Sequence, residues 1–360
     1  MIEPIRWKNN KIVFIDQTKL PARLRYAACG DIDMLCEAIK KLRIRGAPLI
    51  GVAVGLGYAL SAVNSKAKTY KGLKKDLEAA SKKLRATRPT AVNLFWALDR
   101  MKRKLETSRL VRFRRPRSKN NIVRASEVSR EQAIRQIKKD ILKEALDILE
   151  EDKAMCRAIG KNGAGLIKNK DVILTHCNAG ILATAGQGTA LSIIYEAKKQ
   201  GKRFKVYAGE TRPLMQGSRL TMWELIKNHI DATLICDNMA ASVIKNKGVT
   251  KIIVGADRIA RNGDAANKIG TYGLAVLAKH HGIPFYIAAP SSTIDRNIKS
   301  GKDIPIEERN RIELIYSGSK QTAPLGSKVY NPAFDVTPRS LISAIITEKG
   351  VYEVKRFRRI

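Results

Sequence analysis

The chain has 360 residues, of which 44% are hydrophobic and 28% are charged, and its formal net charge is +35. This length and apolar fraction are sufficient for a sizeable core divided between two domains. The N-terminus carries no long apolar stretch, so we expect no secretory signal. The longest apolar run, residues 49–63, is too short to span a bilayer, so it predicts a buried helix and argues against a membrane protein.

The excess of positive charge raises the question of nucleic-acid binding, because basic proteins gain affinity by releasing counterions from phosphates. The basic residues are spread along the chain, however, without a zinc finger, an RNP-type aromatic strand or a helix-turn-helix pattern. We therefore expect no specific nucleic-acid binding. Residues 109–124 differ, since they contain seven Lys or Arg, no acid and the helix breaker Pro116. They predict an exposed basic insert near residues 108–130.

Residues 1 to about 25 predict short strands, with a hairpin turn at Asn9-Asn10. From Asp31 onward the apolar period becomes helical. Further helical patterns cover residues 72–85, 91–106 and 132–160. The chain is thus predicted to begin with a mainly helical domain that carries a β-hairpin and extends over residues 1–165.

From residue 166 onward, apolar strand patterns alternate with helical ones. The strands lie in the segments DVILTHC, FKVYAGE, ATLICD, KIIVGAD and IPFYIAAP, whose ends are 20 to 33 residues apart. Spacing of that length requires a crossover connection between parallel strands. Residues 166–360 are therefore predicted to form a Rossmann-like, doubly wound parallel sheet domain, and the fold class is α/β.

Polar residues end these apolar strands. They are Cys177, Glu210, Asp237, Asp257 and the turn at residues 290–293. In a doubly wound sheet the carboxyl ends of the strands line a crevice, where ligands bind. Helix N-capping would explain Asp237 and Ser292, but it explains Cys177 poorly. The pattern therefore predicts an active site built around Cys177 and Asp257.

The sequence offers little support for a metal or a nucleotide cofactor. The five cysteines are sparse and form no CxxC pair, which predicts a reduced, cytoplasmic protein without a metal site. His176 adjoins Cys177, but neighbours on a strand point to opposite faces, so we expect no Cys-His nucleophile pair. Gly186 and Gly188 offer only part of a dinucleotide fingerprint, because Leu191 stands where the third glycine belongs.

Several cationic side chains next to turns indicate a phosphorylated substrate. Arg45 precedes a glycine and a proline suited to the first turn of a helix, so its guanidinium and backbone N–H groups can share one phosphate. Arg88 lies in a comparable turn, and Asn267-Lys268 supplies an amide and a point charge. Each alone fits a solvated surface residue, but beside two reactive strand ends they favour a phosphate site.

At these residues the chain resembles the methylthioribose-1-phosphate isomerases of the methionine salvage pathway. The segments that carry the resemblance are RGAPLIG, ATRPTAVN, THCNAGILAT, GETRPLMQGSRLTMWEL, DNMAA, GADRIARNGDAANKIGTY, IPFYIAAPSSTID and VYNPAFDVTP. That family is related to the regulatory subunits of the eukaryotic initiation-factor guanine-exchange complex and to archaeal ribose-1,5-bisphosphate isomerase. The fold alone therefore does not determine the function.

The resemblance implies an isomerase that converts the sugar phosphate 5-methylthioribose 1-phosphate into 5-methylthioribulose 1-phosphate. A homodimer is expected by analogy with related folds. No metal-ligand set is visible in the sequence, so we expect catalysis without a cofactor. By motif, the resemblance implies that Asp257 is the catalytic acid and Cys177 the second catalytic residue. The substrate-binding positions that it implies are Arg45, Gly46, Ala47, Arg88, Gln216, Asn267 and Lys268. The basic insert departs from the family pattern.

The chemistry leaves two routes open. Because C1 is held as a glycosyl phosphate, the ring must open first, and a protonated Asp257 in an apolar site can supply that proton. Hydrogen then moves from C2 to C1, either through a cis-enediol with the Cys177 thiolate as base or as a hydride shift in a dry pocket.

Two other functions also stay open. The first is an isomerase of ribose 1,5-bisphosphate or 5-deoxyribose 1-phosphate, which differs in its pocket around C5. A methylthio group there needs an apolar wall, for which the candidates are Trp7, Trp96 and Trp223. The second is a non-enzymatic regulatory subunit, which would have no need of the Cys177 and Asp257 pair.

Overall fold

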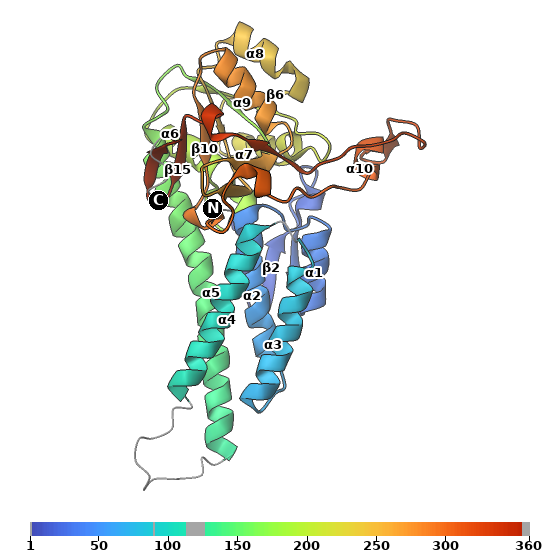
Figure 1. Cartoon of the computed structure of the whole chain (residues 1–360), viewed down its shortest axis with the longest axis vertical. Helices are drawn as coiled ribbons and strands as arrows, with labels where there is room; N and C mark the ends of the chain where they lie inside the picture. The colour runs from blue at the N-terminus through green and yellow to red at the C-terminus, as the bar shows by residue number, and fades with distance from the viewer. Residues whose placement is uncertain (1, 89–90, 113–126, 355–360) are drawn as a thin grey trace.

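The computed structural model describes residues 2–88, 91–112 and 127–354, and it shows a bundle of long helices below a sheet-containing region (Figure 1). Most of the predicted basic insert, residues 113–126, lies outside the described residues. The α/β fold class is confirmed. The predicted division at residue 165 falls between the end of helix α5 at Ala164 and the start of strand β4 at Val172; it stays a prediction.

The N-terminal residues form a small antiparallel sheet of strands β1 (Ile5–Lys8), β2 (Lys11–Ile15) and β3 (Tyr26–Cys29). Lys8 pairs with Lys11, so Asn9 and Asn10 make the two-residue turn that the sequence predicted. Both asparagines have positive φ, 50° and 53°, as the tight hairpin turn requires. The third strand extends beyond the predicted hairpin.

Five helices follow. They are α1 (Ile32–Lys40), α2 (Ala47–Asn64), α3 (Tyr70–Arg85), α4 (Val92–Arg112) and α5 (Glu127–Ala164). The carboxylate of Asp31 caps α1 by accepting the backbone N–H of Met34 at 2.8 Å. All four predicted helical patterns are confirmed, and α4 and α5 are longer than predicted.

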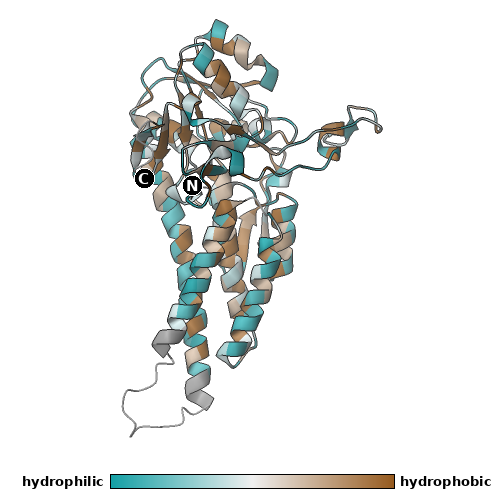
Figure 2. Cartoon of the chain, in the orientation of Figure 1, coloured by the Kyte–Doolittle hydropathy of each residue, from teal (hydrophilic) through white to brown (hydrophobic). Residues whose placement is uncertain are grey.

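Helix α2 is the centre of this bundle. It is apolar on all sides because it packs against α1, α3, α4 and α5, and 83% of it is buried inside the protein. Its length and composition alone would also fit a membrane span. Its burial among the other helices instead confirms the buried helix that the sequence predicted. Figure 2 shows hydrophobic residues gathered on α2 and hydrophilic residues on the outer faces of α3 and α4.

The second region is built on a seven-stranded sheet in the order β16-β15-β10-β7-β4-β5-β6. The strands are β4 (Val172–Thr175), β5 (Lys205–Gly209), β6 (Ala232–Ile235), β7 (Lys251–Val254), β10 (Phe285–Ala288), β15 (Ala344–Thr347) and β16 (Gly350–Glu353). Neighbours are parallel except for β15 and β16. The chain proceeds outward from β4 on one side and from β7 on the other, which is the doubly wound arrangement predicted.

Helices cover both faces of this sheet. One apolar core includes residues of α5, α6 (Ala190–Lys199) and α7 (Met222–Lys227). The other includes residues of α8 (Ala240–Lys247) and α9 (Thr271–His280). The strand order reverses between β4 and β7, so the crevice at their carboxyl ends is where a doubly wound sheet places its ligand.

A smaller sheet was not predicted, because its short strands contain polar residues and so form no apolar run. Its order is β11-β8-β9-β14, with β8 (Arg258–Ala260), β9 (Ala265–Lys268), β11 (Ile294–Asp295) and β14 (Phe334–Thr337). Between β11 and β14 the chain projects from the body as an arm that carries α10 (Ile312–Ile315) and the hairpin β12 (Tyr316–Ser317) and β13 (Lys320–Gln321) (Figure 1).

Candidate active site

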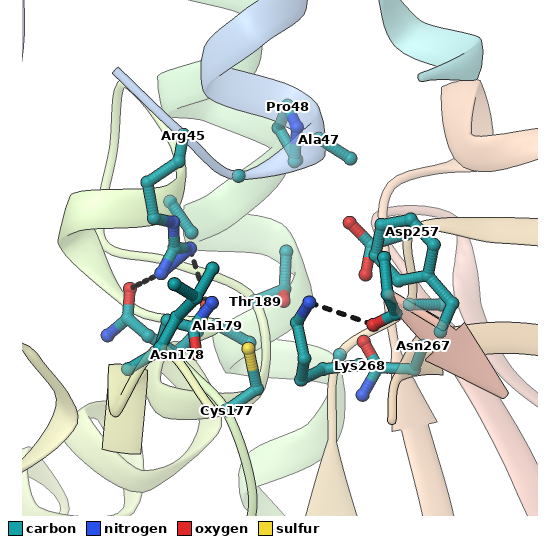
Figure 3. Close-up of a pocket in the computed structure, with 18 of the residues that line it drawn as sticks. Arg45, Ala47, Pro48, Cys177, Asn178, Ala179, Thr189, Asp257, Asn267 and Lys268 are labelled. Carbon is teal, nitrogen blue, oxygen red and sulfur yellow. Dashed lines mark hydrogen bonds between the residues drawn. The ribbon is translucent and has the colours of Figure 1, made fainter. Parts of the chain in front are cut away.

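A cavity lies at the switch point of the large sheet, between the carboxyl ends of β4 and β7 and the first turn of α2 (Figure 3). The space free of protein atoms is about 750 Å³, open solvent at the mouth included. All nine site residues predicted from the sequence line it: Arg45, Gly46, Ala47, Arg88, Cys177, Gln216, Asp257, Asn267 and Lys268. The structure therefore brings together residues that are up to 223 positions apart in the chain (45 to 268).

Cys177 is held in a left-handed backbone conformation, with φ of 61°, two residues after β4. Such a φ is uncommon for a residue with a side chain. Hydrogen bonds hold the residue on both sides: its N–H donates to Thr211 Oγ1 at 2.9 Å, and its carbonyl accepts from Thr221 Oγ1 at 2.5 Å. Burial raises the pKa of the thiol, although the positive charges of Arg45 and Lys268 oppose this. The thiol is therefore neutral at neutral pH.

Asp257 follows β7 and faces the same cavity, with Lys268 between it and Cys177 in the view of Figure 3. Its N–H donates to the carbonyl of Ala266 at 2.9 Å, which ties the loop after β7 to strand β9. Burial raises the pKa of the Asp257 carboxyl, and the nearby charges of Lys268, Arg88 and Arg45 lower it by less. The net effect favours the protonated acid at higher pH than for an exposed aspartate.

Arg45 and the start of α2 form the side of the cavity opposite these strands (Figure 3). The Arg45 guanidinium donates to Asn178 Oδ1 at 3.0 Å and to the Asn178 carbonyl at 2.8 Å. Gly46 precedes the helix with φ of 97°, and a Cβ there would lie 2.5 Å from Ala183 Cα. Only glycine fits this close approach, which places Gly46, Ala47 and Pro48 at the start of α2 in the lining of the cavity.

Strand β9 contributes Asn267 and Lys268, both buried. The Lys268 ammonium donates to the carbonyl of Ala333 at 2.8 Å and lies 4.8 Å from the ring centre of Phe334. Burial lowers its pKa, while Cys177 and Asp257 oppose that shift. Asn267 Nδ2 donates to Thr271 Oγ1 at 3.0 Å. The side-chain oxygen of Asn267, Oδ1, therefore points away from Thr271.

Gln216 and Arg88 complete the predicted set. Gln216 is 7% exposed, and among the described residues its Oε1 has no hydrogen-bond partner, which is unusual for a buried amide. Arg88 contacts the carboxylate of Glu307 at 3.2 Å. Arg309, which also lines the cavity, contacts Glu307 at 2.7 Å and Glu313 at 2.5 Å. The base of the projecting arm thus supplies carboxylates to the guanidinium groups at the cavity mouth.

Some predictions at the strand ends were wrong. Glu210 and Asp237 are not among the described residues that line the cavity. Asp237 does not cap a helix with its side chain, because its carboxylate accepts the N–H groups of Thr211 and Arg212 at 2.8 and 2.7 Å. The ring of His176 has its Nε2 2.8 Å from the carbonyl of Ile269, so it takes part in packing the loops beside the cavity.

The tryptophan prediction was also wrong. Trp7 and Trp96 pack against the core of the helical region, and Trp223 packs against a small cluster around Leu20 and Leu220. The apolar part of the cavity lining comes instead from smaller side chains and one phenylalanine: Leu42, Pro48, Ala179, Ala183, Leu214 and Phe334. Burial in a core is the more common role of tryptophan.

Sequence reasoning missed the residues that support the site, among them Asn178, Glu224, Glu307 and Arg309. Asn178 adjoins Cys177 in the chain, so its position was a usable signal. Glu224 and Glu307 act through contacts with residues 46 and 219 positions away, which no local pattern reveals. Within the described ranges, no group of three or more His, Cys, Asp or Glu side chains has the arrangement of a metal site.

Fold and cavity together define an α/β protein with a cationic ligand cavity at the switch point of its sheet. Residues 43–354 match the model of the initiation factor 2 subunit family. The chain is 50% identical to the methylthioribose-1-phosphate isomerase of Desulforamulus reducens, over 96% of this chain and 94% of the relative. It is 49% identical to the 5-deoxyribose 1-phosphate isomerase of Moorella thermoacetica, over 97% of this chain and 94% of the relative.

Solved structures give the same result. The chain is similar to the 5-methylthioribose 1-phosphate isomerase of Pyrococcus horikoshii, with a TM-score of 0.85, 43% identity and coverage of 100% of this chain and 94% of the other. It is also similar to the translation initiation factor eIF-2B, subunit delta, of A. fulgidus, with a TM-score of 0.81, 44% identity and full coverage of both chains. The chain belongs to the initiation factor 2 subunit family.

Proposed function

We propose that this protein is an aldose-ketose isomerase that interconverts 5-methylthioribose 1-phosphate and 5-methylthioribulose 1-phosphate in methionine salvage. The observation that carries the proposal is the pairing of a half-buried acid, Asp257, with a half-buried thiol, Cys177, in one cavity that also receives a helix N-terminus. Several relatives at about 50% identity are named for this reaction, which agrees with that chemistry.

The phosphate is proposed to bind between the first turn of α2 and the cationic side chains. Backbone N–H groups at a helix N-terminus favour an anion, and the Arg45 guanidinium beside them adds two planar donors. Gly46 and Ala47 let the phosphate approach the backbone, while Arg88 and Lys268 add positive charge. Gln216 Oε1, which has no hydrogen-bond partner among the described residues, and Asn267 Oδ1 are proposed to accept hydrogen bonds from the sugar hydroxyl groups.

Ring opening is assigned to Asp257. Its raised pKa favours the protonated carboxyl, which can deliver a proton to the ring oxygen as the bond between that oxygen and C1 breaks. The hydrogen on C2 then moves with its electron pair to C1. The C2 hydroxyl returns a proton to Asp257 as the C2 carbonyl forms. C1 is reduced and C2 is oxidised, so the reaction balances without an external redox partner.

Of the two routes left open by the sequence, the hydride shift has the better support. A cis-enediol route needs the Cys177 thiolate as base, and burial raises the pKa of this thiol and so disfavours the thiolate. A neutral thiol beside a cation developing at C1 and C2 instead supplies a polarisable contact and excludes water. Cys177 is therefore assigned to transition-state stabilisation.

The surroundings of the cavity bear on the C5 group of the sugar. Arg309 is paired with two carboxylates, Glu307 and Glu313, which disfavours a second phosphate there and hence ribose 1,5-bisphosphate. Leu42 and Leu214 provide an apolar surface that suits a methylthio group. The 5-deoxy sugar lacks only that group, so it is the stronger alternative, and apolar contacts of this size discriminate by roughly 10- to 200-fold.

The proposal also covers the oligomeric state of the protein, its cellular location and its binding of nucleic acid. Exposed apolar side chains occur on edge strand β6 (Leu234), in the turn that follows it (Met239) and on α9 (Tyr272 and Val276), and they favour a homodimer. Sedimentation of a monomer at micromolar concentration would contradict this. All five cysteines are free thiols, which fits the cytoplasm. Specific nucleic-acid binding is not proposed, because the positive charge in the cavity is accounted for by a sugar phosphate.

The test is turnover of purified protein on three sugars: 5-methylthioribose 1-phosphate, 5-deoxyribose 1-phosphate and ribose 1,5-bisphosphate. We expect the highest kcat/KM for the methylthio sugar and loss of turnover in both Asp257→Asn and Cys177→Ser. Preference for another sugar would keep the chemistry and change the substrate. No turnover on any of the three would overturn the proposal and favour a regulatory subunit.

A further inference from the structure

Glu224 on α7 is a fully buried carboxylate that lies outside the lining of the cavity. Its two oxygens accept four hydrogen bonds: from Asn178 Nδ2 at 2.9 Å, from the N–H groups of Ile181 and Leu182 at 2.7 and 3.0 Å, and from the Tyr195 hydroxyl at 2.9 Å. Three of the four donors belong to the loop that follows Cys177. One carboxylate therefore holds that loop together.

The chemistry of these donors requires a carboxylate that only accepts hydrogen bonds. Two of them are backbone N–H groups and one is an amide NH₂, none of which can accept a hydrogen bond. Gly180 makes the close approach possible, because a Cβ at that position would lie 2.1 Å from Glu224 Oε2. Burial of a charge is costly unless it is fully hydrogen-bonded, as it is here.

The same hydrogen bonds determine how Asn178 is oriented. Its Nδ2 donates to Glu224 and, at 3.2 Å, to Thr221 Oγ1, so its Oδ1 faces the opposite direction. There Oδ1 accepts from Arg45 Nη1, while the Asn178 carbonyl accepts from Arg45 Nη2. A continuous path of hydrogen bonds thus runs from Glu224 through Asn178 to the guanidinium in the cavity. Figure 3 shows the part of this path between Asn178 and Arg45.

We propose that Glu224 is a positioning residue of the active site: through Asn178 it orients the Arg45 guanidinium for the phosphate group and fixes the loop that begins at Cys177. The inference rests on the proposed function for its effect on turnover, but its effect on phosphate binding can be measured without turnover. Loss of Glu224 should therefore weaken the binding of phosphate groups more than it slows the chemical step.

The first test is Glu224→Gln, which keeps the size of the side chain but turns an NH₂ group toward donors. We expect KM for the sugar phosphate and the Kd of inorganic phosphate, measured by calorimetry, to rise about 10- to 100-fold, as for loss of one hydrogen bond to a charged group, with a smaller fall in kcat. Asn178→Ala should raise both constants by a similar factor, and the double variant should be no worse than the more affected single variant.

The matched control is Asp171→Asn. Asp171 lies at the other end of β4 and accepts the N–H of Lys168 at 2.6 Å and the Thr250 hydroxyl at 2.8 Å. Its loss should lower thermal stability and leave KM and phosphate binding unchanged. If Glu224→Gln does not fold, Asn178→Ala alone decides the matter. Wild-type phosphate binding in folded Glu224→Gln or in Asn178→Ala, or additive effects in the double variant, would overturn the proposal. Wild-type protein that binds phosphate without sugar turnover would instead contradict the proposed function.

Discussion

The two sides of the cavity differ in the interactions that their polar groups make. On the side of α2 and the loop after β4, the polar groups are paired: Arg45 with Asn178, and Asn178 with Glu224. On the side of β7 and β9, Asp257 and Lys268 have pKa values that are moved toward the neutral forms by burial. Arg45, which is proposed to bind a constant charge, is held by hydrogen bonds, whereas burial raises the pKa of Asp257, which is proposed to exchange a proton. Substitutions on the two sides should therefore have different kinetic effects.

The largest effect is expected on the side of β7. Asp257→Asn keeps the size of the side chain and removes the proton donor, so kcat should fall about 10²- to 10⁴-fold with little change in KM. Steady-state kinetics on the sugar phosphate would measure this. A variant that lost affinity and kept kcat would place Asp257 on the binding side and contradict the comparison.

The other side of the cavity, formed by α2 and the loop after β4 and proposed to bind the phosphate, should respond in the opposite manner. Arg45→Ala removes both donors to Asn178 and the positive charge beside the first turn of α2, so KM should rise about 10- to 100-fold with a smaller change in kcat. The control is Arg43→Ala. Arg43 pairs with Asp16 and Glu37, does not line the cavity, and should leave KM unchanged. An unchanged KM in Arg45→Ala would remove Arg45 from the phosphate site.

Much of this division was predictable from the sequence. Cys177 and Asp257 were identified because apolar strands of four residues end just before them, and Arg45 because a glycine and a proline mark the start of a helix. The small sheet that carries Lys268 was not, because polar residues interrupt its strands, so that they form no apolar run. The contact between Asn178 and Glu224 spans 46 positions and follows from tertiary packing alone.

The pH dependence of turnover tests the role of Asp257 on the β7 side of the cavity. Burial raises the pKa of Asp257, and the protonated acid is the active form. Turnover under saturating substrate should therefore persist above the pH at which an ordinary aspartate ionises, near 4, and fall as the pH rises through the raised pKa. A kcat profile that rises across that range would show that the ionised carboxylate is required, and would reverse the assigned role.

The smallest effect concerns Asp152, a buried acid on α5 that supports the loop between β4 and α6. It accepts the N–H of Ala185 at 2.6 Å, and burial raises its pKa to about 6. The folded state then holds a proton that the unfolded state releases near pH 4. The resulting stability is fully present below pH 4 and is lost as the pH rises through 6, by about 3 kcal/mol.

Asp152→Asn should remove this contribution, so the difference in unfolding free energy between the two proteins should change with pH over that interval. Urea denaturation at pH 4, 5, 6 and 7 would measure it. Other acids with a raised pKa, such as Asp335 with a pKa of about 6, change the unfolding free energy of both proteins equally and cancel in the difference. Parallel curves for the two proteins would show that Asp152 titrates at an ordinary pKa.

In the proposed mechanism hydrogen moves directly from C2 to C1, beside the neutral Cys177 thiol and with Asp257 as the proton donor. Turnover of 5-methylthioribose 1-phosphate labelled with deuterium at C2, carried out in ordinary water, tests it most directly. We expect the ketose product to retain the deuterium on C1, as shown by NMR. Loss of the label to solvent would require a cis-enediol and an ionised base, and would contradict the roles assigned here to Cys177 and Asp257.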